Sequence, residues 1–217
     1  TNGAFDSASQ TYGRGVLAIK LTTDEALRGM PYLSLTADGG IPRNIALQAA
    51  LGLENTYTGT LELTDKLIAG IYWAVVGAYD QFGNRTGEVN AGASIIIDTQ
   101  GPQVISLNTT PSAPIQNNVN GREIDINFAL DEEQDNTKLP LLIPGVLSTY
   151  GEFSPLAGFE NGFSASNDGN RWVAGMTLPG SLALEEVTTL YFKVITQDKL
   201  GNKREAWIDR SGIEVYQ

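Results

Sequence analysis

Carboxylate and amide side chains follow two strand-like segments of this chain, where they can close a turn or bind a divalent cation. The pattern Asp-x-x-Gly-Asn occurs at residues 80–84 and again, 118 positions later, at residues 198–202. Asp and Asn side chains hydrogen-bond to the backbone of tight turns, and Gly tolerates positive φ. The motif therefore predicts a hairpin bend at each place, and such a bend needs no metal.

Aromatic rings are the other side chains of this sequence that could bind a ligand, because planar rings stack on sugars. The candidates for stacking are Trp73, Trp172, Trp207, Tyr150 and Tyr191. We take Trp172, Tyr150 and Phe159 as candidate ligand-binding residues. The alternative is structural, since amphipathic rings near strand ends often cover the edge of a core.

Composition excludes several classes of site. The chain has no histidine and no cysteine, so it has no His-dependent triad, thiolate site or disulfide. Its 25 acidic and 14 basic residues give a net charge of −11, which argues against binding to nucleic acids and to anionic lipid surfaces. Two carboxylates would suffice for a glycosidase. No nucleophile elbow or phosphate-binding loop is present, however, and we predict that the protein is not an enzyme.

The elements expected to carry these residues are β-strands. Residues 70–79 are almost continuously apolar, which predicts a central strand covered on both faces, or a strand with one wet face behind large rings. Residues 189–198 alternate cleanly, with Leu190, Phe192, Val194 and Thr196 on one face. With 24 Gly, 9 Pro and no sustained helical periodicity, the composition predicts an all-β chain.

Internal repetition predicts two domains. The strand beginning at Leu17 returns 107 positions later at Ile124, and each copy runs into an acidic pair, Asp24-Glu25 and Asp131-Glu132. We therefore expect two tandem immunoglobulin-like β-sandwiches, residues 1–100 and 101–217, the second with a long insertion around residues 135–170. Tyr150 and Phe159 lie in that insertion, and its aromatic residues either pack it onto the sandwich or form a ligand surface.

The start of the first domain differs from the start of the second. Residues 103–107 have no counterpart before Thr1, so we expect the first domain to lack the beginning of its first strand, unless a neighbour supplies it. The chain has no Met or signal peptide at its start and no apolar run near the roughly 20 residues that span a bilayer. We interpret it as a piece of a longer protein, with no membrane insertion in this segment.

The strand ending in Asp-x-x-Gly-Asn, followed by a last strand that closes on Ile97-Asp98-Thr99-Gln100-Gly101-Pro102, resembles the bacterial immunoglobulin-like repeats of large extracellular and adhesin-type proteins. The resemblance covers both halves and is best over residues 72–102. The second half departs from it, with Leu190 where Tyr72 stands and Tyr216 where Asp98 stands.

Some members of that family bind calcium at module junctions. The resemblance implies Asp80, Asn84 and Asp98 as calcium ligands here, joined by Asp24 or Glu25, because calcium takes six to eight oxygen ligands. The hinge is expected around residues 98–103, where Pro102 restricts φ and Gly101 keeps some freedom. Calcium binding would straighten this hinge, and small-angle scattering with and without a chelator would detect the change.

The resemblance implies a structural role at the bacterial cell surface or outside the cell. The expected function is a non-catalytic spacer or protein-interaction stalk, and the alternative is a carbohydrate-binding accessory domain. The expected partners are a surface protein or glycan of a host or neighbouring cell, together with further domains of the same polypeptide.

Overall fold

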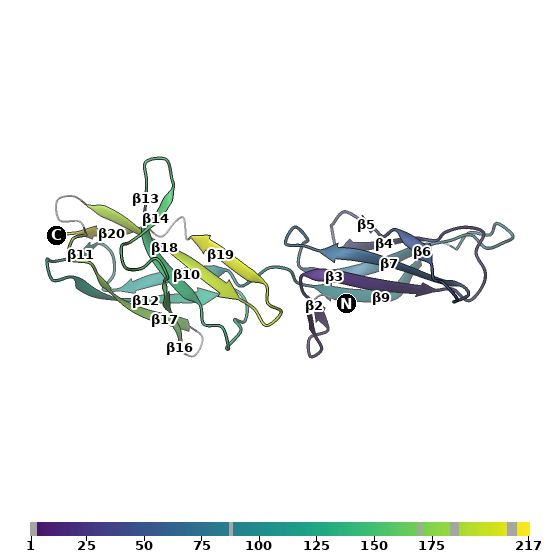
Figure 1. Cartoon of the computed structure of the whole chain (residues 1–217), viewed down its shortest axis with the longest axis horizontal. Helices are drawn as coiled ribbons and strands as arrows, with labels where there is room; N and C mark the ends of the chain where they lie inside the picture. Colours follow the sequence, from purple (N-terminus) through teal and green to yellow (C-terminus); the bar gives the residue numbers. More distant parts are fainter. Residues whose placement is uncertain (1–3, 87–88, 169–170, 183–186, 208–211) are drawn as a thin grey trace. The chain divides into compact units, whose positions relative to one another are not determined.

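The computed structural model describes residues 4–86, 89–168, 171–182, 187–207 and 212–217 (Figure 1). In this part of the chain no helix is long and apolar enough to cross a membrane. The chain divides into two compact units, the first comprising Thr1–Gln100 with Leu200–Asn202 and the second Gly101–Lys199 with Lys203–Gln217. Each unit has its own hydrophobic core between two sheets.

The larger sheet of the first unit has the strand order β1-β2-β9-β8-β4-β5. Its strands are β1 (Phe5–Asp6), β2 (Thr11–Tyr12), β9 (Val89–Ile97), β8 (Gly70–Gly77), β4 (Tyr32–Ala37) and β5 (Arg43–Asn44). Neighbouring strands are antiparallel except for β2 and β9, which run parallel. The hairpin bend predicted at residues 80–84 lies between β8 and β9.

The smaller sheet of the first unit has the order β3-β7-β6, with β3 (Gly15–Thr22), β7 (Thr56–Leu63) and β6 (Leu47–Ala49). Its strands are antiparallel. Leu17, Leu63, Tyr72 and Ile97 are among the buried residues that fill the space between the two sheets. The outer face of β8 is open, with Ile71 and Trp73 exposed, so this strand has one wet face.

The second unit repeats the plan. One sheet has the order β10-β12-β17-β16, with β10 (Val104–Thr110), β12 (Arg122–Leu130), β17 (Arg171–Leu178) and β16 (Ser166–Asp168). The other has the order β11-β20-β18-β13-β14, with β11 (Ile115–Gln116), β20 (Ile213–Tyr216), β18 (Thr188–Gln197), β13 (Leu141–Leu147) and β14 (Phe153–Pro155). In addition, β15 (Phe163–Ser164) pairs with β13 and β19 (Lys203–Trp207) with β18.

Both units are immunoglobulin-like β-sandwiches, which confirms the predicted fold class. In each, the early strand β3 or β12 pairs with β7 or β17, while the opposite sheet is built on the central strand β8 or β18. In each, a short strand near the start of the unit lies parallel to its last strand, β2 beside β9 and β11 beside β20. The alternation predicted for β18 is confirmed, since Leu190, Phe192, Val194 and Thr196 are all buried.

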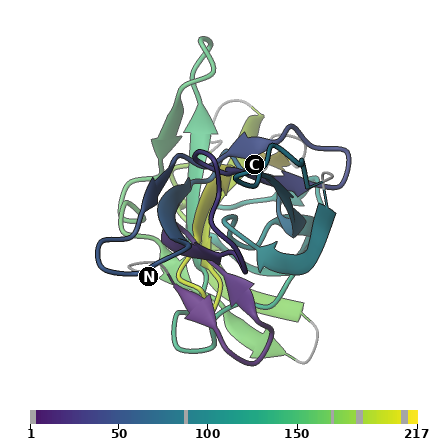
Figure 2. The same ribbon diagram turned by 90° about the vertical axis from the view of Figure 1, so that its right-hand side faces the viewer.

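The stretch predicted as an insertion is largely built into the two sheets, because residues 135–170 contain β13, β14, β15 and β16. Its most prominent feature is the β13–β14 hairpin, which stands out from the rest of the second unit in both ribbon views (Figures 1 and 2).

A hydrogen bond closes the corner that leads into β8. The side chain of Tyr72 is buried, and its hydroxyl donates to the carbonyl oxygen of Ile68 at 2.9 Å. This arrangement resembles the tyrosine corner of immunoglobulin-like sandwiches, in which a tyrosine near the start of the equivalent strand bonds back to the backbone a few residues upstream. Leu190 occupies the same place in β18 and cannot form this bond.

Candidate functional site

The Asp80 turn, residues 80–84, closes on its own side chains. One carboxylate oxygen of Asp80 accepts the backbone N–H of Asn84 at 2.7 Å, and the other accepts the Asn84 side-chain amide at 2.6 Å. The N–H of Gly83, a residue with a φ of 88°, donates to the Asp80 carbonyl oxygen at 3.1 Å. Both oxygens of the carboxylate are therefore engaged in forming the bend.

These bonds set the acidity of Asp80. Partial desolvation, the largest single influence, raises the pKa, but hydrogen bonds from the Asn84 side chain and from the backbone of residues 82–84 outweigh it. The net effect is a pKa below the ordinary value of 3.8. A carboxylate with a lowered folded-state pKa stabilises the fold above its unfolded-state pKa, and this contribution is lost as pH falls through the folded-state pKa.

We predict that Asp80→Asn lowers the stability of the first unit at neutral pH and that the difference from wild type shrinks in acid. The reason is that protonation removes the charged acceptor from the wild type, which then resembles the variant that already lacks it. Urea unfolding at neutral pH and at a pH below the folded-state pKa measures the two differences. Asp38→Asn, at an exposed turn position, is the matched control. It should leave the stability of the first unit unchanged at both pH values. An Asp80→Asn effect of equal size at both pH values would contradict the prediction.

The predicted calcium ligands do not form one site. Asp80 follows β8 and Asp98 follows β9, and because these strands are antiparallel neighbours, the two residues lie at opposite ends of the sheet. β8 has 8 residues, and at about 3.3 Å per residue a strand of this length holds its ends more than about 20 Å apart. Asp80 and Asn84 therefore cannot share one calcium ion with Asp98, contrary to the ligand set that the resemblance implied.

Asp98 has a local role in backbone structure, whereas the acidic pair of the first unit lies on an exposed loop. The Asp98 N–H donates to the Tyr12 carbonyl at 2.9 Å, and its carboxylate accepts the Gln100 N–H at 3.1 Å. Asp24 and Glu25 are exposed in the loop after β3. That loop reaches the Asp80 turn, because Leu27 forms an isolated bridge with Asp80. Within the described residues of the first unit alone, no three carboxylates converge.

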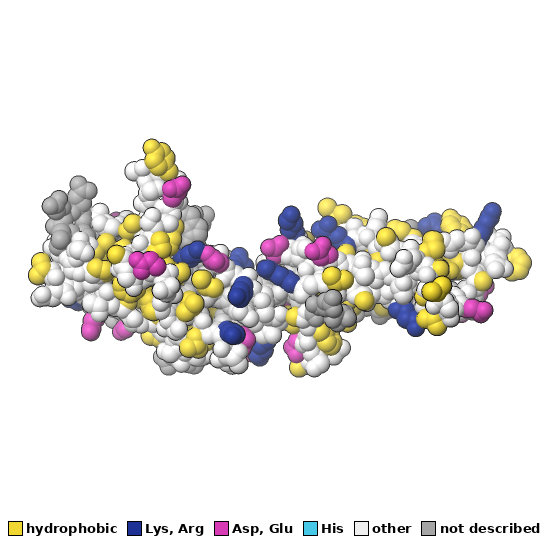
Figure 3. Space-filling view, viewed as in Figure 1, with side chains coloured by type: hydrophobic (Ala, Val, Ile, Leu, Met, Phe, Trp, Pro, Cys, Tyr) yellow, Lys and Arg dark blue, Asp and Glu magenta, His cyan; other side chains and the backbone are white. Residues whose placement is uncertain are grey.

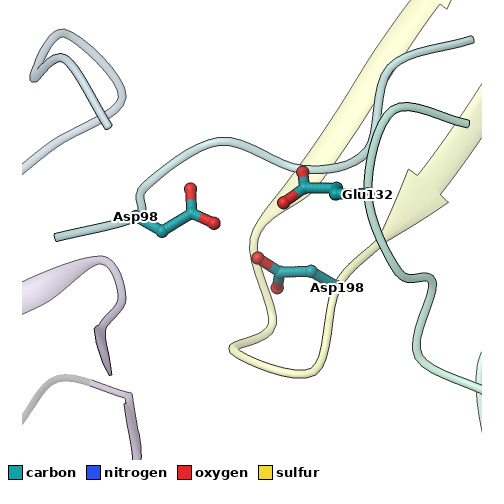
Figure 4. A group of neighbouring side chains, drawn as sticks. All are labelled: Asp98, Glu132 and Asp198. Carbon is teal, nitrogen blue, oxygen red and sulfur yellow. The ribbon is translucent and has the colours of Figure 1, made fainter. Parts of the chain in front are cut away.

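In the second unit two carboxylates do converge. Glu132 follows β12 and Asp198 follows β18, and their carboxylate oxygens lie within 4.8 Å of each other. Figure 4 shows the pair on adjacent loops, and it also labels Asp98, which follows β9 of the first unit. Glu132 is half-buried, whereas Asp198 is only 5% exposed. The internal repeat could have revealed this pair from the sequence, because Glu25 and Asp80 occupy the equivalent positions of the first unit.

The acidic residues on either side of Glu132 are engaged elsewhere. The carboxylate of Asp131 accepts the Gln103 N–H at 2.7 Å and so fixes the approach to β10. Glu133 forms an ion pair with Lys199 at 2.5 Å, and the hydrogen bond and charge of Lys199 lower the pKa of Glu133. The pair of Glu132 and Asp198 offers four oxygens at most, fewer than the six to eight that calcium takes.

An open hollow of about 560 Å³ lies beside this acidic loop. Its lining is mostly polar and comprises Leu130, Asp131, Glu132, Glu133, Gln134, Asn136, Asn167, Trp172 and Lys199. Such a hollow suits a small polar ligand or ordered water. The lining contains no Ser, Thr or Cys side chain, and its ionisable groups are three carboxylates and one lysine.

The candidate aromatic residues differ in how deeply their side chains are buried. Trp172 is 6% exposed and lies in the core of the second unit, although it also lines the acidic hollow, so little of its ring is open to stacking. Phe159 packs against the same core and meets Phe163 edge-on, with ring centroids 5.9 Å apart. Phe159 therefore helps to pack the insertion onto the sandwich, which was the structural alternative to a ligand surface. Trp73 is 40% exposed, and the side chain of Trp207 lies outside the described residues.

Tyr150 differs from the other candidates because it is 92% exposed at the tip of the β13–β14 hairpin. The turn beneath it is well bonded, since the Ser148 hydroxyl oxygen accepts the backbone N–H groups of Tyr150 at 3.2 Å and Glu152 at 3.1 Å. The hairpin tip carries hydrophobic and acidic side chains together (Figure 3). The structure thus presents an aromatic ring on an ordered support.

No protein-family model matches the chain, and no curated protein matches it. Among solved structures, it is similar to a DUF4785 family protein of Legionella pneumophila, with 11% identity, a TM-score of 0.34 and coverage of 94% of this chain and 54% of that one. It is also similar to the I-band fragment I67–I69 of titin (13%, TM-score 0.35, coverage 93% and 60%). A third similar structure is the D00–D0 domain of intimin (13%, TM-score 0.29, coverage 95% and 92%).

The chain spans between half and two thirds of the length of the first two of these structures. The likeness is distant in every case, and the fold assignment rests on the strand order and register of the chain itself.

Proposed function

We propose that the chain is a non-catalytic structural module of a bacterial secreted or cell-surface protein, serving as a load-bearing spacer and protein-interaction stalk. The single observation that carries this proposal is the parallel pairing of an early strand with the last strand inside each unit. In the first unit Thr11 pairs with Ile96 and Tyr12 with Ile97. In the second, Ile115 pairs with Val215 and Gln116 with Tyr216.

Backbone hydrogen bonds join these parallel strands. The Asp98 N–H donates to the Tyr12 carbonyl at 2.9 Å, and the Asn117 N–H donates to the Tyr216 carbonyl at 2.7 Å. When the two ends of such a unit are pulled apart, the strands slide past each other and their bonds are loaded together. Bonds loaded together resist force better than bonds that open one after another. Resistance to forced unfolding is a matter of unfolding rate, which this geometry lowers.

Single-molecule pulling on the second unit tests the proposal. Because the chain has no cysteine, paired Cys substitutions give unique attachment points at exposed positions. Ser112→Cys with Gln217→Cys pulls β11 from its beginning and β20 from its end, which loads the pair in shear. Val119→Cys with Gln217→Cys pulls both strands from the same end, which peels them apart. We expect clearly higher rupture forces in the first geometry.

The peeling variant is the matched control, because it keeps the same sandwich and one of the same attachment points. Equal rupture forces in the two geometries would remove the basis for a load-bearing role. The partners we propose are further domains of the same polypeptide and a surface protein of a host or neighbouring cell. The carbohydrate-binding alternative has weaker support, since Trp172, one of its candidate rings, is only 6% exposed.

A further inference from the structure

The β13–β14 hairpin extends beyond the sheet that carries it (Figures 1 and 2). In the described chain β13 pairs with β18 as far as Gly145, and beyond that point Val146 and Leu147 pair with β14 alone. The equivalent strands of the first unit, β4 and β5, pair at Ser34 and Leu35, and both of these residues also pair with β8. The first unit forms its sandwich without such a projection, so the fold alone does not require one.

The projecting hairpin is braced at its base and closed at its tip. A Cβ atom on Gly145 would lie 2.5 Å from the ring of Phe153, so this glycine lets the ring pack against the strand. At the tip the Ser148 N–H donates to the Glu152 carbonyl oxygen at 2.8 Å, and the Gly151 N–H donates to the Ser148 carbonyl oxygen at 2.9 Å. Because the hairpin is already ordered, docking through its tip costs little conformational entropy.

The tip of this hairpin presents an aromatic ring and a carboxylate. Tyr150 is 92% exposed, and Glu152 is exposed in the same turn. Tyrosine is enriched among the residues that contribute most to protein–protein binding. A surface that accepts this tip is therefore concave, with an apolar interior for the ring and positive charge for the carboxylate.

A hollow with these properties lies in the same unit. Its volume of about 390 Å³ is in the range of pockets that hold small molecules. Its lining includes three aliphatic side chains and two lysines, namely Leu139, Leu141, Ile195, Lys138 and Lys203. None of the described residues that line this lysine hollow is acidic.

Two other hollows match the tip less well. The acidic hollow beside Glu132 is lined by three carboxylates, which would repel Glu152. A hollow of about 510 Å³ on the smaller sheet of the first unit is lined by a single lysine, Lys20. The lysine hollow is therefore the better match in charge.

The tip cannot reach the lysine hollow of its own molecule. Leu141 lines the hollow at the beginning of β13, and Leu147 precedes the tip at the end of the same strand. β13 has 7 residues, and at about 3.3 Å per residue its ends lie about 20 Å apart. The turn that follows Leu147 lies farther still from the hollow, so a tip that docks there belongs to another molecule.

We propose that the chain binds a second copy of itself, with the hairpin tip of one molecule docked in the lysine hollow of the other. The Tyr150 ring packs against the aliphatic side chains of the hollow, and the Glu152 carboxylate lies beside its two lysines. Because tip and hollow are different surfaces, the contact either closes as a reciprocal pair or continues as an open chain of molecules. This self-association goes beyond the load-bearing spacer, and rupture forces measured on single molecules do not depend on it.

Sedimentation velocity of the whole chain over a series of protein concentrations tests the proposal. The net charge of −11 opposes association, so the measurement is made at physiological ionic strength, where salt screens charges farther apart than about 8 Å. We expect the wild type to associate as its concentration rises, and Tyr150→Ala to weaken the association about tenfold or more. A wild type that is still monomeric at about 1 mM, where even a weak contact is populated, would overturn the proposal. Undiminished association of Tyr150→Ala would do the same.

Charge reversal distinguishes this contact from association through another surface. Glu152→Lys and Lys138→Glu should each weaken association about tenfold, and the two substitutions combined in one chain should recover most of it. Lys20→Glu makes the same charge change in the hollow of the first unit and is the matched control, which should associate as the wild type does. All three residues are exposed, so the variants should fold, and circular dichroism checks this. A double variant that does not recover, or equal weakening by Lys20→Glu, would place the contact elsewhere and overturn the proposal.

Discussion

Replacing Trp172 with alanine is expected to lower the free energy of unfolding of the second unit by about 3–5 kcal/mol, as for other large aromatic residues removed from a core. The ring is 6% exposed, and Trp172 pairs across the sheet with Phe128, which is 1% exposed. Urea unfolding followed by circular dichroism measures the effect. The transition of the first unit should not move, because that unit has its own core.

Tyr150→Ala is the matched control within the same unit. Its ring is 92% exposed, and substitutions at such positions usually change stability by less than about 0.5 kcal/mol. A Trp172→Ala protein that unfolds normally but loses glycan binding would restore the carbohydrate-binding hypothesis. Loss of stability without any effect on glycan binding would leave Trp172 as a core residue alone.

The fold was predictable from sequence because two signals are local. The first is the strict alternation of Leu190, Phe192 and Val194, which follows from a strand with one face in the core and one in water. The second is the Asp-x-x-Gly-Asn turn, which at residues 80–84 is closed by hydrogen bonds within five consecutive residues. In residues 80–84 the structure shows both oxygens of Asp80 bonded within that turn.

The candidate site was predicted less well than the fold. Residues can bind one ion only if the loops that carry them lie at the same end of the sandwich, and the sequence does not show which loops do. Asp80 and Asp98 are close in the motif but follow successive antiparallel strands, so they lie at opposite ends of the sheet. Within the second unit, the carboxylates that lie close together follow β12 and β18, where Glu132 and Asp198 meet. Neither strand pairs with the other, and only the three-dimensional packing of the two sheets brings these loops together.

The burial of Trp172 could not be predicted from the sequence of its strand alone. Alternation places Trp172, Ala174 and Met176 on one face of β17, but alternation alone does not say which face is covered. That is decided by the neighbouring strand, because β12 presents Phe128 opposite Trp172.

Removing the ring of Tyr72 is expected to affect the first unit as strongly as Trp172→Ala affects the second. Tyr72 is 2% exposed in the core of the first unit, so Tyr72→Ala should cost about 3–5 kcal/mol in unfolding free energy. Tyr72→Phe isolates the hydroxyl, which donates to Ile68 at 2.9 Å, and should cost about 1 kcal/mol, the typical net contribution of a hydrogen bond. Urea unfolding of the first unit measures both.

The second unit supplies the control for this pair, because Leu190 occupies the place of Tyr72 and is fully buried without any hydrogen bond from its side chain. Tyr72→Leu therefore places in the first unit the residue that the second unit has at this position. It should destabilise the first unit less than Tyr72→Ala does. If Tyr72→Phe left stability unchanged, the corner bond would have no net effect, since water would then serve the Ile68 carbonyl equally well. If Tyr72→Leu proved as harmful as Tyr72→Ala, the two cores would differ in shape despite their common strand order, because a leucine that fills one would leave a cavity in the other.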